Sequence, residues 1–114
     1  MTLLPALIAL TMGSAVPSAA GPYDGKWVGT AAEAGDCGVL TVTLIVKDNA
    51  ITGTVNGKHG TPPIDSGTVA PDGTALVTYA PRAFKGNIRF TGNRFIGNFN
   101  SVCGVRAVTG SRSP

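Results

Sequence analysis

The alternation of apolar and polar residues between positions 84 and 100 predicts an antiparallel hairpin that contains all four phenylalanines of the chain. Gly92-Asn93 is a hairpin turn signal, and a turn there pairs Phe90 with Phe95. Because side chains alternate along a strand, one face of the hairpin is apolar and the other is polar and basic. The apolar face comprises Phe84, Gly86, Ile88, Phe90, Phe95, Gly97 and Phe99.

The same alternation predicts two further hairpins. The Asp-Asn pair at 48–49 tolerates positive φ and makes a two-residue turn that pairs Val46 with Ile51. The Pro-Asp-Gly sequence at 71–73 makes a second turn, with proline presetting φ and glycine in the left-handed position. We therefore predict an all-β antiparallel up-and-down meander of about eight strands, forming a closed or half-closed small barrel. The predicted strands lie at about residues 27–32, 39–47, 51–55, 65–70, 75–79, 84–91, 94–100 and 103–111.

Three glycines, Gly53, Gly86 and Gly97, fall in mid-strand on the predicted inner face. Glycine weakens a strand, so each position needs a reason. One reason is the sharp coiling that closes a small barrel, with Phe99 covering Gly86 from the opposite strand. The other reason is room for a ligand inside the barrel.

The N-terminus predicts an export signal. An apolar run at 3–12 is too short to span a bilayer as a helix. Small residues follow it, and Ser18 and Ala20 suit a signal-peptidase site. We predict a signal peptide at 1–20 and a single domain at 21–114, which places the protein in the periplasm or outside the cell. The segment before the apolar run lacks Lys and Arg, and a buried N-terminal helix is the alternative.

Two cysteines, Cys37 and Cys103, predict one disulfide in an exported protein. The bridge would contribute about 4 kcal/mol on the chain-entropy account. Cys37 precedes the second predicted strand and Cys103 opens the last, so the bridge fits best if the first and last strands are neighbours, as in a barrel. Two cysteines and one histidine do not make a four-ligand zinc site, and we predict no metal and no cofactor.

Charge is distributed unevenly along the chain. Three basic and six acidic residues precede residue 73, and six basic residues follow it with no acid. This asymmetry can steer anionic partners, although a solvated outer barrel face is the favoured explanation. Nucleic acid is an unfavourable partner, because the neighbouring aromatic side chains point inward and leave no stacking platform. The candidate basic patch comprises Arg82, Lys85, Arg89 and Arg94.

Catalytic chemistry has few candidates. His59 is the sole histidine and lies in a loop rich in Gly and Pro. No nucleophile elbow accompanies it, and turn chemistry explains Asp48 and Asp72. We predict no catalytic residues and no enzyme activity, with His59 as an exposed loop residue.

Two resemblances add to this interpretation. Gly25-Lys26-Trp27, with Arg106 or Arg112 in the last strand to stack on the indole, resembles the calycin signature of lipocalin- and avidin-type barrels. The chain from residue 21 onward is also similar to short exported alphaproteobacterial β-domain proteins, which share D-G-x-W-x-G, an early and a late C-G, and F-x-G-x-x-F-x-G. That second resemblance implies an exported β fold and no particular activity.

The leading hypothesis is a non-enzymatic binding module. Its partner is either a small apolar ligand in the barrel mouth or an anionic partner, such as an envelope polymer, on the basic face. A protease-inhibitor-like small barrel acting through an N-terminal arm, a structural or envelope-associated protein without a pocket, and a small hydrolase are the alternatives. The candidate ligand-binding residues are Trp27, Tyr79, Phe90 and Phe95.

Overall fold

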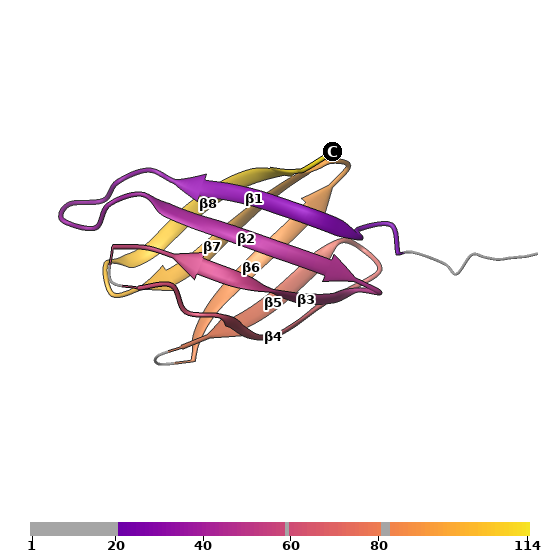
Figure 1. Ribbon diagram of the computed structural model, residues 1–114, viewed down its shortest axis with the longest axis horizontal. Helices are drawn as coiled ribbons and strands as arrows, with labels where there is room; N and C mark the ends of the chain where they lie inside the picture. Colours follow the sequence, from indigo (N-terminus) through magenta and orange to yellow (C-terminus); the bar gives the residue numbers. More distant parts are fainter. Residues whose placement is uncertain (1–20, 59, 81–82) are drawn as a thin grey trace, which may run out of the picture.

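Eight strands form a closed antiparallel barrel in which each strand pairs with its neighbours in the chain (Figure 1). The computed structural model describes residues 21–58, 60–80 and 83–114. The predicted signal peptide at 1–20, His59 and Arg82 therefore lie outside the described residues. The strands are β1 (Gly25–Ala31), β2 (Leu40–Lys47), β3 (Ala50–Asn56), β4 (Ile64–Val69), β5 (Thr74–Tyr79), β6 (Phe84–Thr91), β7 (Arg94–Ser101) and β8 (Gly104–Arg112).

The register of the predicted hairpins is confirmed. Phe90 pairs with Phe95 across β6 and β7, and Val46 pairs with Ile51 across β2 and β3. A slip of one residue would turn the inner side chains of a strand outward, so the burial pattern and the turns together fix the pairing. The predicted all-β meander is confirmed, and the barrel is closed.

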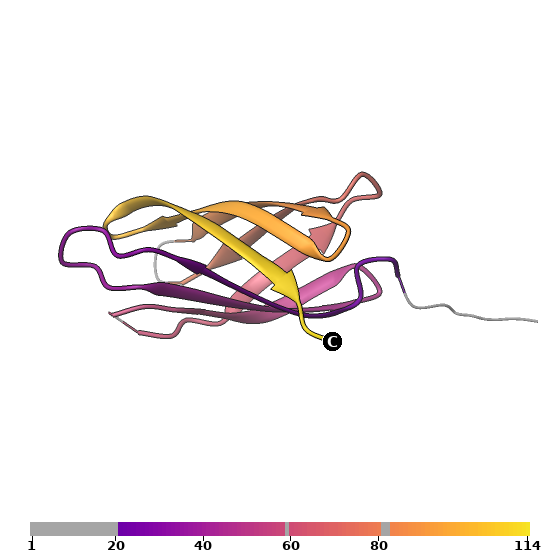
Figure 2. The same ribbon diagram turned by 90° about the horizontal axis from the view of Figure 1, so that it is seen from above.

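The seam between β1 and β8 closes the sheet. Figure 2 shows β8, in yellow, crossing to the first strand, in indigo, and Gly29 pairs with Gly110 there. A Cβ at Gly29 would lie 2.5 Å from Cζ of Phe95, and a Cβ at Gly110 would collide with the carbonyl of Val28 and the same ring. Two glycines facing each other therefore let the strands meet under an aromatic ring.

The Cys37–Cys103 disulfide is present, with its Cα atoms 6.4 Å apart. It joins the connection between β1 and β2 to the turn between β7 and β8. The prediction that Cys103 opens the last strand was wrong by one residue, because β8 begins at Gly104, which has a positive φ of 88° in the tight turn. The first strand likewise begins at Gly25 instead of Trp27, because its pairing with β2 extends to Val46.

The barrel interior holds two groups of aromatic rings. Trp27 packs edge-on against Phe90 at 4.8 Å and Phe95 at 6.3 Å between ring centroids. Tyr79 packs 6.0 Å from both Phe84 and Phe99 at the other end. The two groups occupy opposite ends of the barrel.

Mid-strand glycines on the inner face accommodate an aromatic ring. A Cβ at Gly86 would lie 2.6 Å from the ring of Phe99, and one at Gly97 would lie 3.0 Å from it. The space beside these two glycines is therefore filled by Phe99. Within the described residues, no helix has the length and apolarity to cross a membrane.

Candidate functional site

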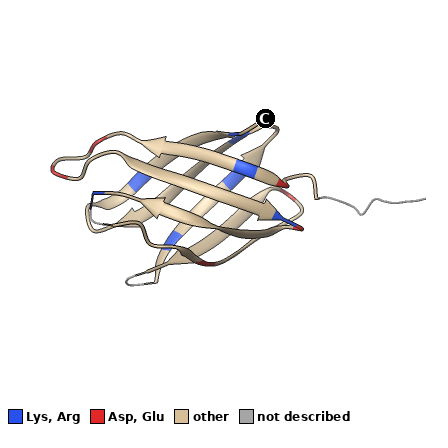
Figure 3. Ribbon diagram, viewed as in Figure 1, with Lys and Arg blue, Asp and Glu red and all other residues tan. Residues whose placement is uncertain are grey.

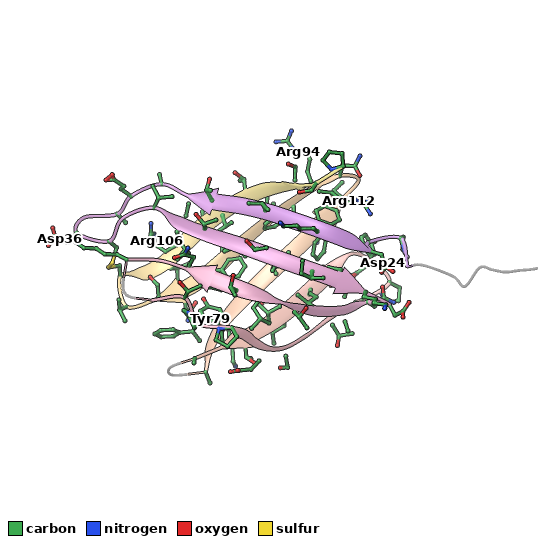
Figure 4. The ribbon with its side chains drawn as sticks, viewed as in Figure 1. Asp24, Asp36, Tyr79, Arg94, Arg106 and Arg112 are labelled. Atoms are coloured by element: carbon green, nitrogen blue, oxygen red, sulfur yellow. A yellow bond between two sulfur atoms is a disulfide. The ribbon has the colours of Figure 1, made fainter. Side chains whose placement is uncertain are left out.

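The structure separates the four residues predicted to contact a ligand. Trp27, Phe90 and Phe95 are buried together at one end of the barrel, which we call the closed end. Tyr79 lies at the opposite end, which also carries the disulfide and which we call the open end (Figure 4). A cavity lies at the open end, and of the four predicted residues only Tyr79 lines it.

Arg112 covers the closed end. Its guanidinium carbon lies 4.5 Å from the centre of the Trp27 ring, in a cation–π arrangement. Of the two arginines predicted to stack on this indole, Arg112 does so. Its nitrogens donate hydrogen bonds to the carbonyls of Pro22, Asp24 and Gly92 and to the side-chain oxygen of Asn93, at 2.9–3.2 Å.

The segment before β1 completes this closure. Tyr23 packs 5.7 Å from Phe90 between ring centroids, and the indole nitrogen of Trp27 donates a 2.9 Å hydrogen bond to the carbonyl of Tyr23. With rings, guanidinium and chain all in contact, the closed end leaves no room for a ligand beside Trp27, whose side chain is fully buried.

The cavity at the open end has a volume of about 150 Å³. An apolar cavity of about this size accepts a molecule the size of benzene. Its walls come from the beginnings of β2, β6 and β8, the ends of β3, β5 and β7, and the loops beyond them. The residues that form its apolar wall are Leu40, Val55, Pro62, Tyr79 and Phe84.

Arg106 is a buried charged residue that lines this cavity. It points inward from β8 opposite Phe99, and its side chain is 5% exposed. Its Nη2 atom donates to the carbonyls of Ala32 and Gly38, the latter at 3.0 Å. Among the described residues its Nε and Nη1 atoms have no acceptor.

Basic groups predominate around the cavity. Lys58 also lines it and donates a 2.9 Å hydrogen bond to the carbonyl of Asp36. None of the described residues that line the cavity is Asp or Glu. The sequence predicted Arg106 only as a partner for Trp27 and not as a residue of this cavity. Its position two residues before the inward-facing Val108 on the same strand indicates that Arg106 also faces inward.

Tyr79 is a neutral part of the wall. Its hydroxyl donates to the carbonyl of Asn100, and burial raises the pKa of Tyr79 to about 12. The phenol therefore stays protonated at neutral pH and supplies no base or nucleophile there. Its place on the cavity wall is compatible with contact to a ligand, and its hydroxyl is already engaged.

The predicted basic patch is dispersed over the outer face. Lys85, Arg89 and Arg94 are exposed on β6 and β7. Lys85 and Arg89 are four residues apart on one strand, or about 13 Å, which exceeds the screening length of about 8 Å in physiological salt. Arg89 and Arg94 are closer, as diagonal neighbours across the pair.

One acid lies near this face. The pKa of Asp72 is lowered, mainly by the hydrogen bond from the Thr74 hydroxyl and, to a smaller extent, by the charge of Arg89. Figure 3 shows Lys and Arg, in blue, mostly within strands and Asp and Glu, in red, mostly at strand ends and in loops. The strands are thus more basic than the strand ends and loops.

Comparison with family models, curated proteins and solved structures finds no match for this chain. The architecture itself defines the class, an eight-stranded antiparallel closed barrel consistent with a calycin-like fold. Within the described residues, no group of His, Cys, Asp or Glu is placed to hold a metal ion. The candidate site is therefore the cavity at the open end.

Proposed function

We propose that this protein is a non-enzymatic binding module that takes a small apolar ligand into the open end of the barrel. The observation that carries the proposal is the cavity of about 150 Å³, walled by apolar side chains, in a barrel whose other end is filled. Ligand sites are typically concave and apolar with a few polar groups, and barrel mouths are frequent places for them.

The surroundings of the cavity support a ligand larger than the cavity itself. Val102 lines the cavity and is 60% exposed. Exposed apolar side chains that gather around a cavity are typical of binding sites. A ring or chain end would enter the cavity, and the rest of the ligand would lie against Val102.

The calycin-type resemblance supports the open end as the ligand site, and the disulfide supports a location for the protein. In that resemblance the tryptophan and the arginine of the last strand close one end of the barrel and the other end receives the ligand. Disulfides persist in oxidising compartments. We therefore propose that the protein acts in the periplasm or outside the cell.

Native mass spectrometry of the protein purified from the organism that makes it tests this proposal. We expect an additional mass that is retained under native conditions and released on denaturation. Ala80→Phe places a ring at the cavity wall and should abolish the additional mass, whereas Leu76→Phe on the outer face of β5 should retain it. A bare mass for the unmodified protein, or equal retention by both variants, would contradict the proposal.

The protease-inhibitor alternative has less support. An inhibitor of that kind needs an exposed arm ahead of Trp27. Here Tyr23 packs on Phe90 and the carbonyls of Pro22 and Asp24 accept hydrogen bonds from Arg112. These residues belong to the closed end, so their contacts favour a structural role for the segment.

A further inference from the structure

The two inward-facing arginines of β8 differ in how their charge is accommodated. Arg112 is partly exposed, and all three of its guanidinium nitrogens donate to protein oxygens. Arg106 is 5% exposed, and among the described residues its acceptors are two carbonyls, both bonded to Nη2. A buried charge is costly unless it is paired and hydrogen-bonded. Within the described part of the chain, Nε and Nη1 of Arg106 thus have no acceptor, and an unpaired donor is costly in a buried position.

The cavity offers the space for the missing partner. Arg106 and Lys58 both line it. The described residues that line it supply no carboxylate, so the positive charge is uncompensated from within the wall. The remaining wall, with Leu40, Val55 and Phe84, suits a hydrocarbon group. One small molecule that carries an anionic group and an apolar body would match both the basic and the apolar part of the cavity wall.

We infer that the cavity binds a small amphiphilic anion, with a carboxylate or a phosphate group on the Nε and Nη1 donors of Arg106 and an apolar body against Leu40, Val55 and Phe84. This inference rests on the proposed function and specifies the ligand class. Hydrogen bonds to a charged group are shorter and stronger than neutral ones. The volume of about 150 Å³ limits the buried part to a single ring or a short chain.

A purely structural role for Arg106 is the competing explanation. Its bonds to the carbonyls of Ala32 and Gly38 connect β8 to the chain that joins β1 and β2. That role requires Nη2 alone. It predicts that charge on a ligand has no effect on affinity, and this difference makes the two explanations separable in the unmodified protein.

The first experiment titrates the 15N-labelled, oxidised protein with four probes and follows the amide signals of Gly38, Gly57 and Gly60 at the cavity. The probes are benzoate, benzyl alcohol, phenyl phosphate and inorganic phosphate. We expect benzoate to bind about 10- to 100-fold more tightly than benzyl alcohol, the range for a hydrogen bond to a charged group. Phenyl phosphate against benzoate then distinguishes the two head groups.

The outcomes separate the two proposals. Equal affinity for benzoate and benzyl alcohol would overturn the anion inference and leave the apolar binding site standing. No response of the cavity amides to any probe would overturn both. Inorganic phosphate that binds as tightly as phenyl phosphate and benzoate would overturn the amphiphile, because the apolar body would then contribute nothing.

A variant series tests the residue. Arg106→Met keeps an unbranched apolar stem and removes the charged guanidinium, and Arg89→Met does the same on the outer face. We expect Arg106→Met to weaken benzoate about tenfold or more while benzyl alcohol changes by less than about twofold, with partial recovery in Arg106→Lys. Unchanged benzoate affinity in Arg106→Met would overturn the assignment. If Arg106→Met does not fold, the four-probe titration decides the question on the unmodified protein.

Discussion

The two ends of this barrel contain similar residues, but one end is filled by side chains and the other contains a cavity. Each end has an arginine that points inward from β8 beside a group of aromatic rings (Figure 4). At the closed end Arg112 lies on Trp27 and the chain before β1 fills the remaining space. At the open end Arg106 lies beneath a cavity. An inward arginine completes the packing of one end and lines a cavity at the other, where we propose that it binds a ligand.

The contacts available to each arginine explain the difference. The turn between β6 and β7 and the segment before β1 both bring carbonyl groups to Arg112. At the open end the connection from β1 to β2 reaches only one nitrogen of Arg106. The disulfide holds that connection against the turn between β7 and β8. The open end is therefore restrained by a covalent link, and the closed end by packing and hydrogen bonds.

The largest expected effect comes from removing the restraint at the open end. The disulfide spans 66 residues of sequence, and its loss in the Cys37→Ser and Cys103→Ser double variant should lower the free energy of unfolding by about 4 kcal/mol. Urea unfolding followed by Trp27 fluorescence measures this change. Hydrogen exchange should accelerate first at Gly38 and Val102, and equal acceleration at Trp27 would contradict the division between the ends.

The glycine seam gives the next largest effect. Gly110→Ala forces a Cβ against the carbonyl of Val28 and the Phe95 ring, and overpacking of this kind should cost about 3 kcal/mol. Gly38→Ala at the open end is the matched control, because an added Cβ there meets no atom within 4 Å. Its change should stay within about 0.5 kcal/mol. Equal unfolding midpoints for the two variants in urea would argue against a tightly packed seam.

Removing the charge at the closed end should have an intermediate effect. Arg112→Met loses the contact with the Trp27 ring and the hydrogen bonds from the guanidinium, at a cost of about 2 kcal/mol. Arg94→Met, on the exposed face of the adjoining strand, should change stability by less than about 0.5 kcal/mol. Thermal unfolding of the two variants measures the difference in stability. If Arg94→Met were the less stable protein, the expected role of Arg112 would be contradicted.

The smallest effect is confined to alkaline pH and to the open end. Burial raises the pKa of Tyr79 to about 12, above the usual tyrosine value of about 10, so the unfolded chain loses this proton first as pH rises. The contribution of Tyr79 to stability is complete below pH 10 and declines between about pH 10 and pH 12. Urea unfolding across this range, in the protein and in Tyr79→Phe, isolates the contribution. The same decline in both proteins would show that Tyr79 does not cause it.

The hairpins could be predicted because the signals that specify them are local. The turns at 48–49 and 92–93 set the pairing, and the alternation of Phe90 and Phe95 with polar neighbours indicates which face is buried. Both signals act within one pair of strands, so no knowledge of the rest of the barrel was needed. The disulfide was also predictable, since two cysteines allow a single pairing.

The candidate site was predicted less well, since Tyr79 alone of the four expected residues lines the cavity. Aromatic residues on an inner face are equally suited to a core and to a ligand, and sequence does not show how many of them meet at one end. Trp27, Phe90 and Phe95 pack on one another. Their contacts depend on strand stagger around the closed barrel, which a pattern along one strand does not contain.

The sequence by itself determined the strands to within a few residues, the registers of the predicted hairpins, the buried face and the cysteine pair, because each depends on residues that are close in the chain or unique in it. Only the tertiary structure decided that Gly29 meets Gly110 under Phe95, that Arg112 covers Trp27 and that Arg106 lies beneath a cavity. These outcomes depend on closure of the sheet, which brings β1 and β8 together from opposite ends of the chain. The same alternation turned both arginines inward, and their surroundings in space gave them different roles.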